Sequence, residues 1–209
     1  MFALTDKVVV KLSPMLDIKM LLREFPECDK IHIVATENEC KEILLEIDTR
    51  TPITENRIYK TINIKKKEVE IFEFSEETEA KALLLLGTPE EGDFLYEPNA
   101  AIMKSGGYKT ITLQYNVAKI HKNSHLYISK EKIENFPGRR FQIFQIIDNF
   151  SKINLKKMLP QKSYNLTVRN FPESADNLKK NLKIRDGGND YLFATTVEPE
   201  KHLLLCCRK

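Results

Sequence analysis

The feature that most constrains this fold is a short apolar strand that begins six residues into the chain. Residues Lys7–Leu12 are continuously apolar at their centre, and the sequence Ser13-Pro14 and a helical pattern follow at once. Such a run is typical of a strand buried on both faces of a parallel sheet. A parallel sheet needs neighbouring strands. We therefore expect the chain to enter a sheet part of the way through its fold.

The next segments support an α/β sheet without a nucleotide-binding turn. The glycine-rich turn that opens a nucleotide-binding βαβ unit is absent after the first strand. A helix is expected over Met15–Glu24, with Leu16, Met20 and Leu21 on its apolar side. A second buried strand, Ile31–Ala35, follows it, and the connection is long enough for a parallel crossover.

The segments after the second strand are less uniform. Cys40–Ile47 fits neither the helical nor the strand period cleanly, so both assignments stay open. Arg57–Ile64 and Glu68–Phe74 alternate polar and apolar residues on either side of a lysine-rich turn, which predicts a hairpin. Ser75–Leu86 is again either strand or helix. Gly87–Asp93, with glycine, proline and four acidic residues, is the expected domain boundary.

The second half of the chain predicts alternating short helices and strands. Pro98 is expected to open a helix that Gly106-Gly107 closes. The last sixty residues have the order α-β-α-β-β, which is typical of a small two-layer α+β module. The predicted elements are helices at Asn99–Lys104, Thr110–Lys119, Lys152–Leu159 and from Ser174 to about Leu182, and strands at Leu126–Ile128, Phe141–Ile147, Asn165–Arg169, Tyr191–Val197 and His202–Cys206.

The net charge of +3 conceals an asymmetry between the two halves. Residues 1–97 hold 13 Lys+Arg and 21 Asp+Glu, a net charge of −8, whereas residues 98–209 hold 20 and 9, a net charge of +11. A basic half suits a polyanion, because bound phosphates release counterions. A solvated lysine-rich surface explains the same charge equally well.

Cysteine usage and hydropathy bear on compartment and metal binding. The four cysteines form no C-x-x-C pair and no regular spacing with histidine, so neither a disulfide framework nor a metal site is expected. The longest apolar run, Ala82–Leu86, is far shorter than the roughly 20 residues that span a bilayer. The N-terminus also lacks the pattern of a signal peptide. We expect a cytoplasmic protein without a membrane partner.

Polar residues at the ends of the first two strands are the first candidate site. Lys11, Ser13 and Asp17 follow one strand, where open α/β sheets bind ligands, and Asn38 follows the next strand on the same edge. A local explanation is favoured: Ser13 is a suitable N-cap, Pro14 suits the first helical position, and Asp17 complements the helix dipole. The Asn38 segment is equally well explained as a polar turn.

A pair of adjacent arginines is the second candidate site. Arg139 and Arg140 follow Pro137-Gly138, and a tight turn can present their forked donors to phosphate. A hairpin turn with solubilising arginines is an equal alternative. No catalytic triad, pair of acid–base carboxylates or metal box is evident. The basic residues that would share a face with the arginines are Lys104, Lys109, Lys119, Lys122 and His125.

Four ordered motifs give the chain a family resemblance: Lys11–Asp17, Asn38–Glu42, Leu95–Lys104 and Phe136–Arg139. They resemble the C-terminal portion of a bacterial family of class I S-adenosylmethionine-dependent methyltransferase-like proteins that carry a ferredoxin-like insert and a C-terminal THUMP-like domain. The resemblance implies an α/β plus α+β architecture. Residues 1–92 would be the last part of a Rossmann-like methyltransferase sheet, 93–145 a ferredoxin-like domain and 146–209 a THUMP-like domain.

The resemblance also implies a function divided between two halves. THUMP domains are associated with RNA-modifying enzymes, so the basic domains would bind structured RNA such as tRNA or rRNA. Full-length members bind S-adenosylmethionine with a preceding half that this chain lacks, so we expect a fragment that neither binds the cofactor tightly nor methylates. Lys11, Ser13, Pro14, Asp17 and Asn38 would then lie at the rim of the active site. The alternative is a non-catalytic interaction module that associates through its truncated sheet edge.

Overall fold

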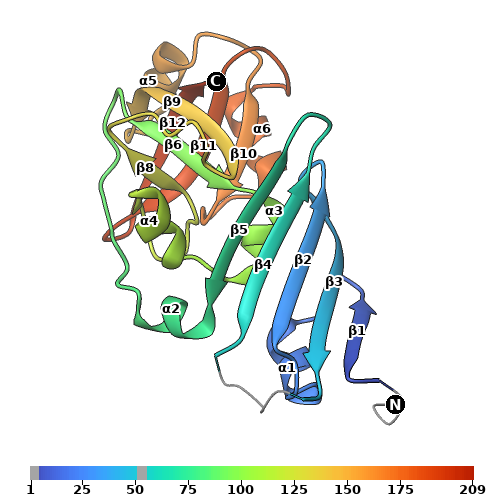
Figure 1. Ribbon diagram of the computed structural model, residues 1–209. Helices are drawn as coiled ribbons and strands as arrows, with labels where there is room; N and C mark the ends of the chain where they lie inside the picture. Colours follow the sequence, from blue (N-terminus) through green and yellow to red (C-terminus); the bar gives the residue numbers. More distant parts are fainter. Residues whose placement is uncertain (1–4, 51–55) are drawn as a thin grey trace. The chain divides into compact units, whose positions relative to one another are not determined.

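A computed structural model describes residues 5–50 and 56–209, which form two compact units (Figure 1). The first unit comprises the segment up to Leu83 together with Pro98–Gln114, and the second comprises Leu84–Glu97 together with Tyr115–Lys209. Each unit contains one sheet and its own helices, so the architecture is mixed α/β. The chain passes between the units three times.

The first unit contains a five-stranded sheet in the order β1-β3-β2-β4-β5. β2 and β4 are parallel, and the other neighbouring pairs are antiparallel. Its strands are β1 (Lys7–Leu12), β2 (Lys30–Thr36), β3 (Glu39–Asp48), β4 (Ile58–Ile64) and β5 (Val69–Ser75), and its helices are α1 (Ile18–Glu24), α2 (Glu76–Lys81), α3 (Ala100–Ser105) and α4 (Thr110–Tyr115).

β1 is an edge strand, so the expectation of a strand buried on both faces of a parallel sheet is wrong. Its neighbour in the described sheet is β3, which runs antiparallel to it. Exposed and half-buried side chains alternate along β1, and Val9 is 63% exposed. Valine suits any strand that has at least one covered face. The apolar run therefore identified the strand correctly but not its surroundings.

β1 and β2 point in the same direction, but they are not neighbours as a simple βαβ crossover would make them. β3 lies between them and pairs with both in antiparallel fashion. β3 is the segment whose period fitted neither helix nor strand. Its Ile43, Leu45 and Ile47 are buried, and the residues between them are half-buried. Partial cover of the second face explains why no clean alternation was visible.

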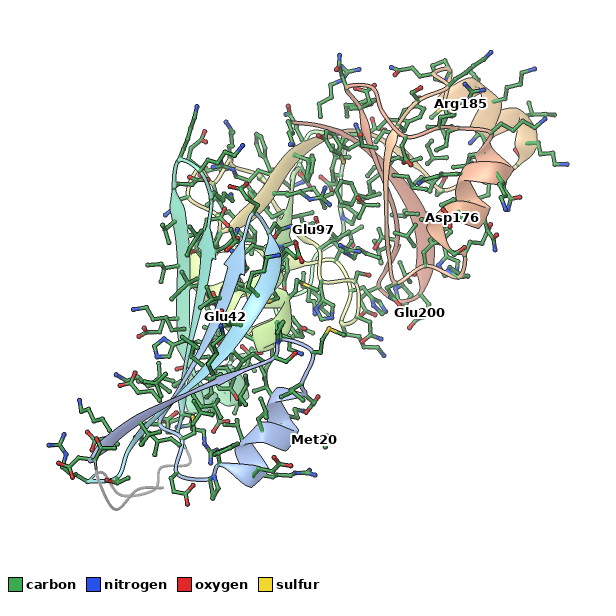
Figure 2. All side chains as sticks on the ribbon, turned by 90° about the vertical axis from the view of Figure 1, so that its right-hand side faces the viewer. Met20, Glu42, Glu97, Asp176, Arg185 and Glu200 are labelled. Carbon is green, nitrogen blue, oxygen red and sulfur yellow. The ribbon has the colours of Figure 1, made fainter. Side chains whose placement is uncertain are left out.

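α1 begins at Ile18, later than the helix expected from Met15. Asp17 is its N-cap and accepts a hydrogen bond from the N–H of Met20 at 3.0 Å, so the assignment of the cap to Ser13 is wrong. Met20 is exposed (Figure 2), as is Leu16, and the helix buries Ile18, Leu21 and Leu22 instead. The apolar side expected for this helix was therefore largely wrong.

The hairpin predicted from alternation is confirmed as β4 and β5, which pair over their full length. The ambiguous segment after β5 forms the short helix α2, which Ser75 caps. α3 packs on the inner face of β2, β3 and β4. Asn99 caps α3, whereas Pro98 ends strand β6 (Phe94–Pro98), so the helical role expected for Pro98 is wrong. The predicted closure by Gly106 is confirmed.

The second unit contains a seven-stranded sheet in the order β10-β11-β12-β9-β6-β8-β7. Helix α4 is shorter than expected because Ala118–Lys119 forms strand β7. The α-β-α-β-β order of the last sixty residues is confirmed, and its strands continue the sheet of β6–β9. Besides β6 and β7, the elements are β8 (Tyr127–Ser129), β9 (Gly138–Ile147), α5 (Lys152–Met158), β10 (Asn165–Arg169), α6 (Ala175–Leu182), β11 (Tyr191–Val197) and β12 (Lys201–Arg208).

The seven-stranded sheet is buried on both faces. Successive residues of β12 belong to different clusters: Leu205 lies in one core and Leu204 and Cys206 in the other. The second cluster also contains Leu159, which follows α5, and Leu178 of α6. The two helices therefore cover the face of the sheet to which Cys206 belongs.

A β-bulge in β9 changes which face its residues occupy. Cys206 is paired with Gln145 and Cys207 with Ile143, so Phe144 has no partner on β12. Since paired residues share a face, Gln145 lies on the face of Cys206. Phe144 follows Ile143, which belongs to the opposite core, so Phe144 lies on the Cys206 face as well. The bulge thus places two consecutive side chains on one face.

Candidate nucleic-acid interface and cavity

The structure brings two of the predicted rim segments of the first unit together. Because β1 and β2 point the same way, their carboxyl ends lie at the same edge of the sheet. The Nζ atom of Lys11 lies 2.6 Å from the carboxylate of Glu42 on β3. The hydroxyl of Ser13 accepts the N–H of Met15 at 3.3 Å, and Pro14 is half-buried in the same turn.

Asn38 belongs to a polar network that fixes the start of α3. Its side-chain oxygen accepts the N–H of Ala100 at 2.8 Å, and its own N–H donates to the side-chain oxygen of Asn63 at 3.0 Å. The side-chain amides of Asn63 and Asn99 both donate to one carboxylate oxygen of Glu70, at 2.8 and 2.9 Å. Asn63 and Asn99 are buried. The network accounts for Asn38 by structure alone.

The described residues at this edge do not fit S-adenosylmethionine. The first 86 residues contain no glycine, so no turn here lets a nucleotide approach the backbone closely. The oxygen acceptors of Ser13, Asp17 and Asn38 are each bonded to a backbone N–H. These groups stabilise turns and helix starts and form no cofactor cradle.

The basic residues predicted to contact RNA are divided between the units. Lys104 and Lys109 belong to the first unit, and Lys122, His125, Arg139 and Arg140 to the second. The Nζ atom of Lys109 donates to the carbonyl of Ala80 at 3.0 Å.

Arg139 is held inside the second unit by a buried carboxylate. The side chain of Glu97 is only 5% exposed and forms ion pairs with both Arg139 and Arg169, the latter at 2.7 Å. The Arg139 guanidinium also lies over the rings of Phe141 and Phe193, 5.5 and 5.8 Å from their centroids. Arg139 is therefore held by a carboxylate and by two aromatic rings of the second unit.

Three other residues of the predicted basic face, Arg140, His125 and Lys119, are paired, uncharged or buried. Arg140 lies 3.5 Å from the carboxylate of Glu134, an exposed pair. Burial, together with the charges of Lys119 and Arg169, lowers the pKa of His125 to about 4, so this imidazole is neutral at pH 7. Lys119 is buried and donates to the carbonyl of Lys122 at 2.7 Å.

His121 is a buried histidine of the second unit, and both of its ring nitrogens have hydrogen-bond partners. The Nδ1 atom of His121 lies 3.0 Å from the N–H of Asn123 and from the side-chain amide of Asn170, and Nε2 lies 3.3 Å from the carboxylate of Glu200. Ser124 donates to the carbonyl of Thr196 at 2.5 Å. The serine hydroxyl is thus directed to a backbone carbonyl, and this cluster is not the arrangement of a nucleophilic triad.

Unpaired cations gather on the helices of the second unit. Residues 138–209 hold 14 Lys+Arg and 7 Asp+Glu, a net charge of +7. Within the described part of the chain, no carboxylate lies within ion-pair distance of eight of these cations. One is Lys209, whose Nζ lies over the ring of Tyr191, and the other seven lie on α5, on α6 or in the segments that follow these helices. These seven are Lys152, Lys156, Lys157, Lys162, Lys180, Lys183 and Arg185; we call them the helical cations.

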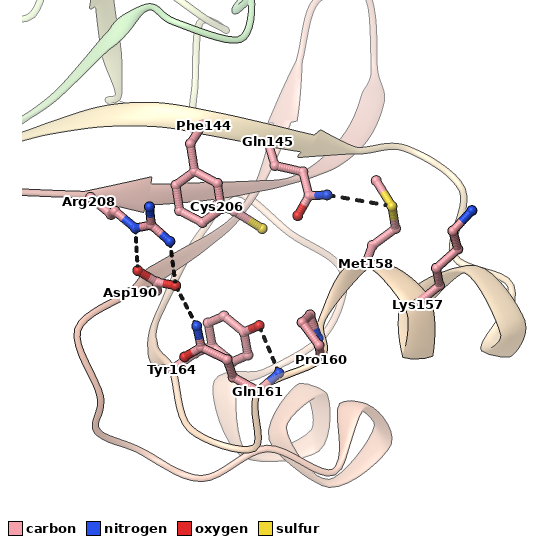
Figure 3. Close-up of a pocket in the computed structure, with 10 residues that line it drawn as sticks. All are labelled: Phe144, Gln145, Lys157, Met158, Pro160, Gln161, Tyr164, Asp190, Cys206 and Arg208. Atoms are coloured by element: carbon pink, nitrogen blue, oxygen red, sulfur yellow. Dashed lines mark hydrogen bonds and ion pairs between the residues drawn. The ribbon is translucent and has the colours of Figure 1, made fainter.

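A cavity of about 220 Å³ opens beside α5 (Figure 3). The sheet contributes the two residues at the bulge together with Cys206 and Arg208. The opposite side comes from α5, from the segment after it and from the residue before β11. The lining residues are Phe144, Gln145, Lys157, Met158, Pro160, Gln161, Tyr164, Asp190, Cys206 and Arg208.

An ion pair organises one end of this cavity. Asp190, whose side chain is 5% exposed, lies 2.8 Å from Nε of Arg208 and accepts the side-chain amide of Gln161 at 2.9 Å. The Arg208 guanidinium beside it lowers the pKa of the Asp190 carboxyl. The same guanidinium lies 4.3 Å from the centroid of the Phe144 ring. Burial raises the pKa of the Cys206 thiol to about 12, so the thiol is protonated at pH 7.

The sequence did not predict this cavity, although it carried one signal of a basic surface beside it. Three lysines without an acidic residue in Lys152–Met158 marked α5 as basic. The adjacent apolar residues Ile143 and Phe144 interrupt the alternation without identifying a bulge, and nothing in the sequence marked the pairing of Asp190 with Arg208.

Residues 5–50 and 56–209 show neither a metal site nor a membrane-spanning helix. No group of three His, Cys, Asp or Glu side chains there could hold a metal ion. None of the described helices is long and apolar enough to cross a membrane.

Two family profiles match consecutive segments of the chain. Residues 94–137 match a ferredoxin-like domain, and residues 138–209 match a THUMP domain-like family. The chain therefore carries both domains implied by the resemblance. The ferredoxin-like segment includes residues of both compact units, whereas the THUMP-like segment lies wholly in the second. The cavity and all the helical cations lie in the THUMP-like segment.

A solved structure matches nearly the whole chain. It is a crystal structure described as a "putative methyltransferase" from Porphyromonas gingivalis W83, with 33% sequence identity and a TM-score of 0.89. The match covers 98% of this chain and 51% of that protein, so this chain spans about half the length of its structural relative. A search of curated proteins found no match.

Proposed function

We propose that this chain is the substrate-binding C-terminal part of an S-adenosylmethionine-dependent methyltransferase that acts on RNA. The observation that carries the proposal is the match, at 33% identity and over 98% of this chain, to the protein described as a "putative methyltransferase". The THUMP-like segment and its net charge of +7 favour RNA as the class of substrate. Methylation itself would need the other half of such a protein.

In this proposal the first unit is the last part of a Rossmann-like methyltransferase sheet. β1, β2 and β4 share one direction, and α1 connects the first two. The free edge of β1 is where further parallel strands would add. Lys11, Ser13, Pro14, Asp17 and Asn38 would then lie on the rim of the active site, while residues outside this chain would hold S-adenosylmethionine, the donor of the methyl group.

The cofactor part of the proposal has a direct test. Calorimetric titration of S-adenosylmethionine into these 209 residues should give no tight stoichiometric binding, because the described rim residues are committed to backbone N–H groups. Tight binding at one site would contradict the proposal that residues outside this chain hold the cofactor.

The RNA part of the proposal assigns the helical cations to phosphate contacts. They have no carboxylate partner within ion-pair distance, whereas Arg139 and Arg140 do, and His125 is uncharged at pH 7, so we rank them above these three residues as RNA contacts; Lys104, Lys109 and Lys122 stay further candidates. A solvated lysine surface is the alternative. The two explanations differ in whether replacing particular lysines changes the salt dependence of binding.

Affinity for a structured RNA, measured at several salt concentrations, separates these explanations. Replacing Lys156 and Lys157 by alanine should weaken binding and reduce the slope of log K against log salt by about 0.7 to 0.9 for each phosphate that is no longer neutralised. The matched control is Lys66→Ala with Lys67→Ala, which removes the same charge from the exposed β4–β5 turn. Equal effects of the two double variants, or no detectable RNA binding, would reject the proposal.

A second candidate function is a non-catalytic interaction module. The specific observation is the exposed edge of β1, with Val9, Met15 and Met20 exposed nearby. An open strand edge readily pairs with another chain. Light scattering tests this directly: a concentration-dependent dimer would favour the module, and a monodisperse monomer would speak against self-pairing.

A further inference from the structure

The geometry points to the cavity beside α5 as a binding site for the base of one unpaired RNA nucleotide. This inference rests on the proposed function in one respect, namely that RNA is the ligand of the THUMP-like segment. It adds the location of the binding site, the feature of the RNA that is recognised, which is an unpaired base, and the side chains that would contact this base. The cavity makes this surface selective for RNA with exposed bases, which a charged surface alone would not achieve.

The size of the cavity suits a single ring system. Its volume of about 220 Å³ is below the range of about 300–1,000 Å³ that is usual for drug-sized ligands. The rings of Phe144 and Tyr164 belong to different sides of the opening, and Pro160 lies beside Tyr164 (Figure 3). Flat side chains on the walls favour a flat ligand, because bases stack on aromatic rings.

Polar groups at the walls match the edge of a base. The Tyr164 hydroxyl accepts the N–H of Gln161 at 3.4 Å, so its own O–H can still donate. The side-chain amide nitrogens of Gln145 and Gln161 donate to Met158 and Asp190, and the amide oxygens of both residues retain their acceptor capacity. A base presents donors and acceptors side by side on its edge, and an aliphatic side chain presents neither.

The site is held in place before any ligand arrives. Asp190 orients both Arg208 and Gln161, and the guanidinium of Arg208 stacks on Phe144. The bulge in β9 places Phe144 and Gln145 together on this face. Side chains fixed in this way lose little freedom on binding, which favours affinity for a small ligand.

The charge around the opening suits the phosphate of the same nucleotide. Arg208 neutralises Asp190, so the cavity itself adds no net negative charge. Lys157 lines the opening, and Lys156 precedes it on α5; no carboxylate lies within ion-pair distance of either among the described residues. A base inside the cavity and its phosphate at Lys157 would use both features at once.

The test uses the full chain, a single-stranded RNA, an RNA duplex and the variant Phe144→Ala. Its matched control is Phe150→Ala, since both phenylalanines are 37% exposed but Phe150 lies outside the cavity. Loss of base stacking corresponds to about 1–3 kcal/mol, or a fall in affinity of roughly 5- to 150-fold. We expect that fall for single-stranded RNA with Phe144→Ala, little change with Phe150→Ala, and little effect of either on duplex binding.

A milder variant and a smaller ligand complete the test. Tyr164→Phe keeps the ring and removes the hydroxyl, so it should weaken binding of one of the four nucleoside monophosphates more than the others while leaving thermal unfolding close to wild type. Amide shifts on titration of these nucleotides should include Gln145 and Tyr164. The absence of such shifts, or unchanged single-strand affinity of a folded Phe144→Ala, would overturn the inference. Amide shifts on titration of nucleotides, without affinity for any RNA, would reject the proposed function but support the cavity as a binding site for a base.

Discussion

Arg208 and Asp190 form an ion pair in which only one partner is buried: the Asp190 side chain is 5% exposed and that of Arg208 62%. Removing Arg208 would leave a buried carboxylate with the amide of Gln161 as its side-chain partner. We expect Arg208→Ala to lower the free energy of unfolding, because the buried Asp190 carboxylate loses its charged partner.

The double variant Asp190→Asn with Arg208→Ala tests the cause of that destabilisation. Because it removes the charge that would be stranded, it should be less destabilised than the sum of the two single variants. Urea denaturation of the four proteins gives the comparison. Simple additivity would contradict the pairing.

Arg139 should be important for stability, and Arg140 should not. Arg139→Ala leaves the buried Glu97 carboxylate with Arg169 as its remaining ion-pair partner and should cost about 2–3 kcal/mol. Arg139→Lys should restore little, because lysine lacks the forked donors and the flat face that lies over Phe141. Arg140→Ala, which breaks an exposed pair, is the control and should cost less than about 1 kcal/mol. Equal destabilisation of the two alanine variants in urea would be inconsistent with this account.

Two adjacent glycines should differ in what they tolerate. Gly106 ends α3 with a φ of 85°, where asparagine is accepted more readily than other residues, so Gly106→Asn should cost less than about 1 kcal/mol. A Cβ atom at Gly107 would lie 2.6 Å from the Phe74 ring and 2.8 Å from the Phe72 ring. Gly107→Ala should therefore cost about 1–3 kcal/mol through overpacking. Thermal unfolding checks both, and a stable Gly107→Ala would disprove the close packing.

His125 should make stability depend on pH between about 4 and 6.5. Its pKa is lowered to about 4 in the folded chain, so between these values the unfolded chain binds more protons than the folded chain. Stability from this residue is thus present above pH 6.5 and decreases as the pH falls towards 4. His125→Asn suits the positive φ of 49° and should flatten the curve of unfolding free energy against pH in this window. An unchanged curve would contradict the depressed pKa.

Local patterns predicted local structure well. Alternation around the lysine turn predicted the β4–β5 hairpin, and Ser174 as an N-cap predicted the start of α6. The same kind of reasoning was wrong for β1, since its surroundings depend on the insertion of β3 between β1 and β2. Strand order is set by pairing between distant segments, and a single strand's composition does not report it.

The candidate site was harder to predict than the fold for the same reason. Arg139 is adjacent to Arg140 in the sequence, but its ion-pair partner Glu97 precedes it by 42 residues. The alternation of β9 is interrupted at Ile143 and Phe144, but two adjacent apolar residues do not by themselves identify a bulge. Charge density in α5 was visible in the sequence. The cavity beside it depends on long-range pairing that was not.

The most direct test of the central claim is a heteronuclear NMR titration of the labelled chain with single-stranded RNA. We expect amide shifts to concentrate in Lys152–Met158 of α5 and at Gln145, Tyr164 and Asp190 around the cavity. Their size should decrease as salt rises at a fixed RNA concentration. Shifts confined to the turn before Arg139, or the absence of shifts in the THUMP-like segment, would contradict the central claim.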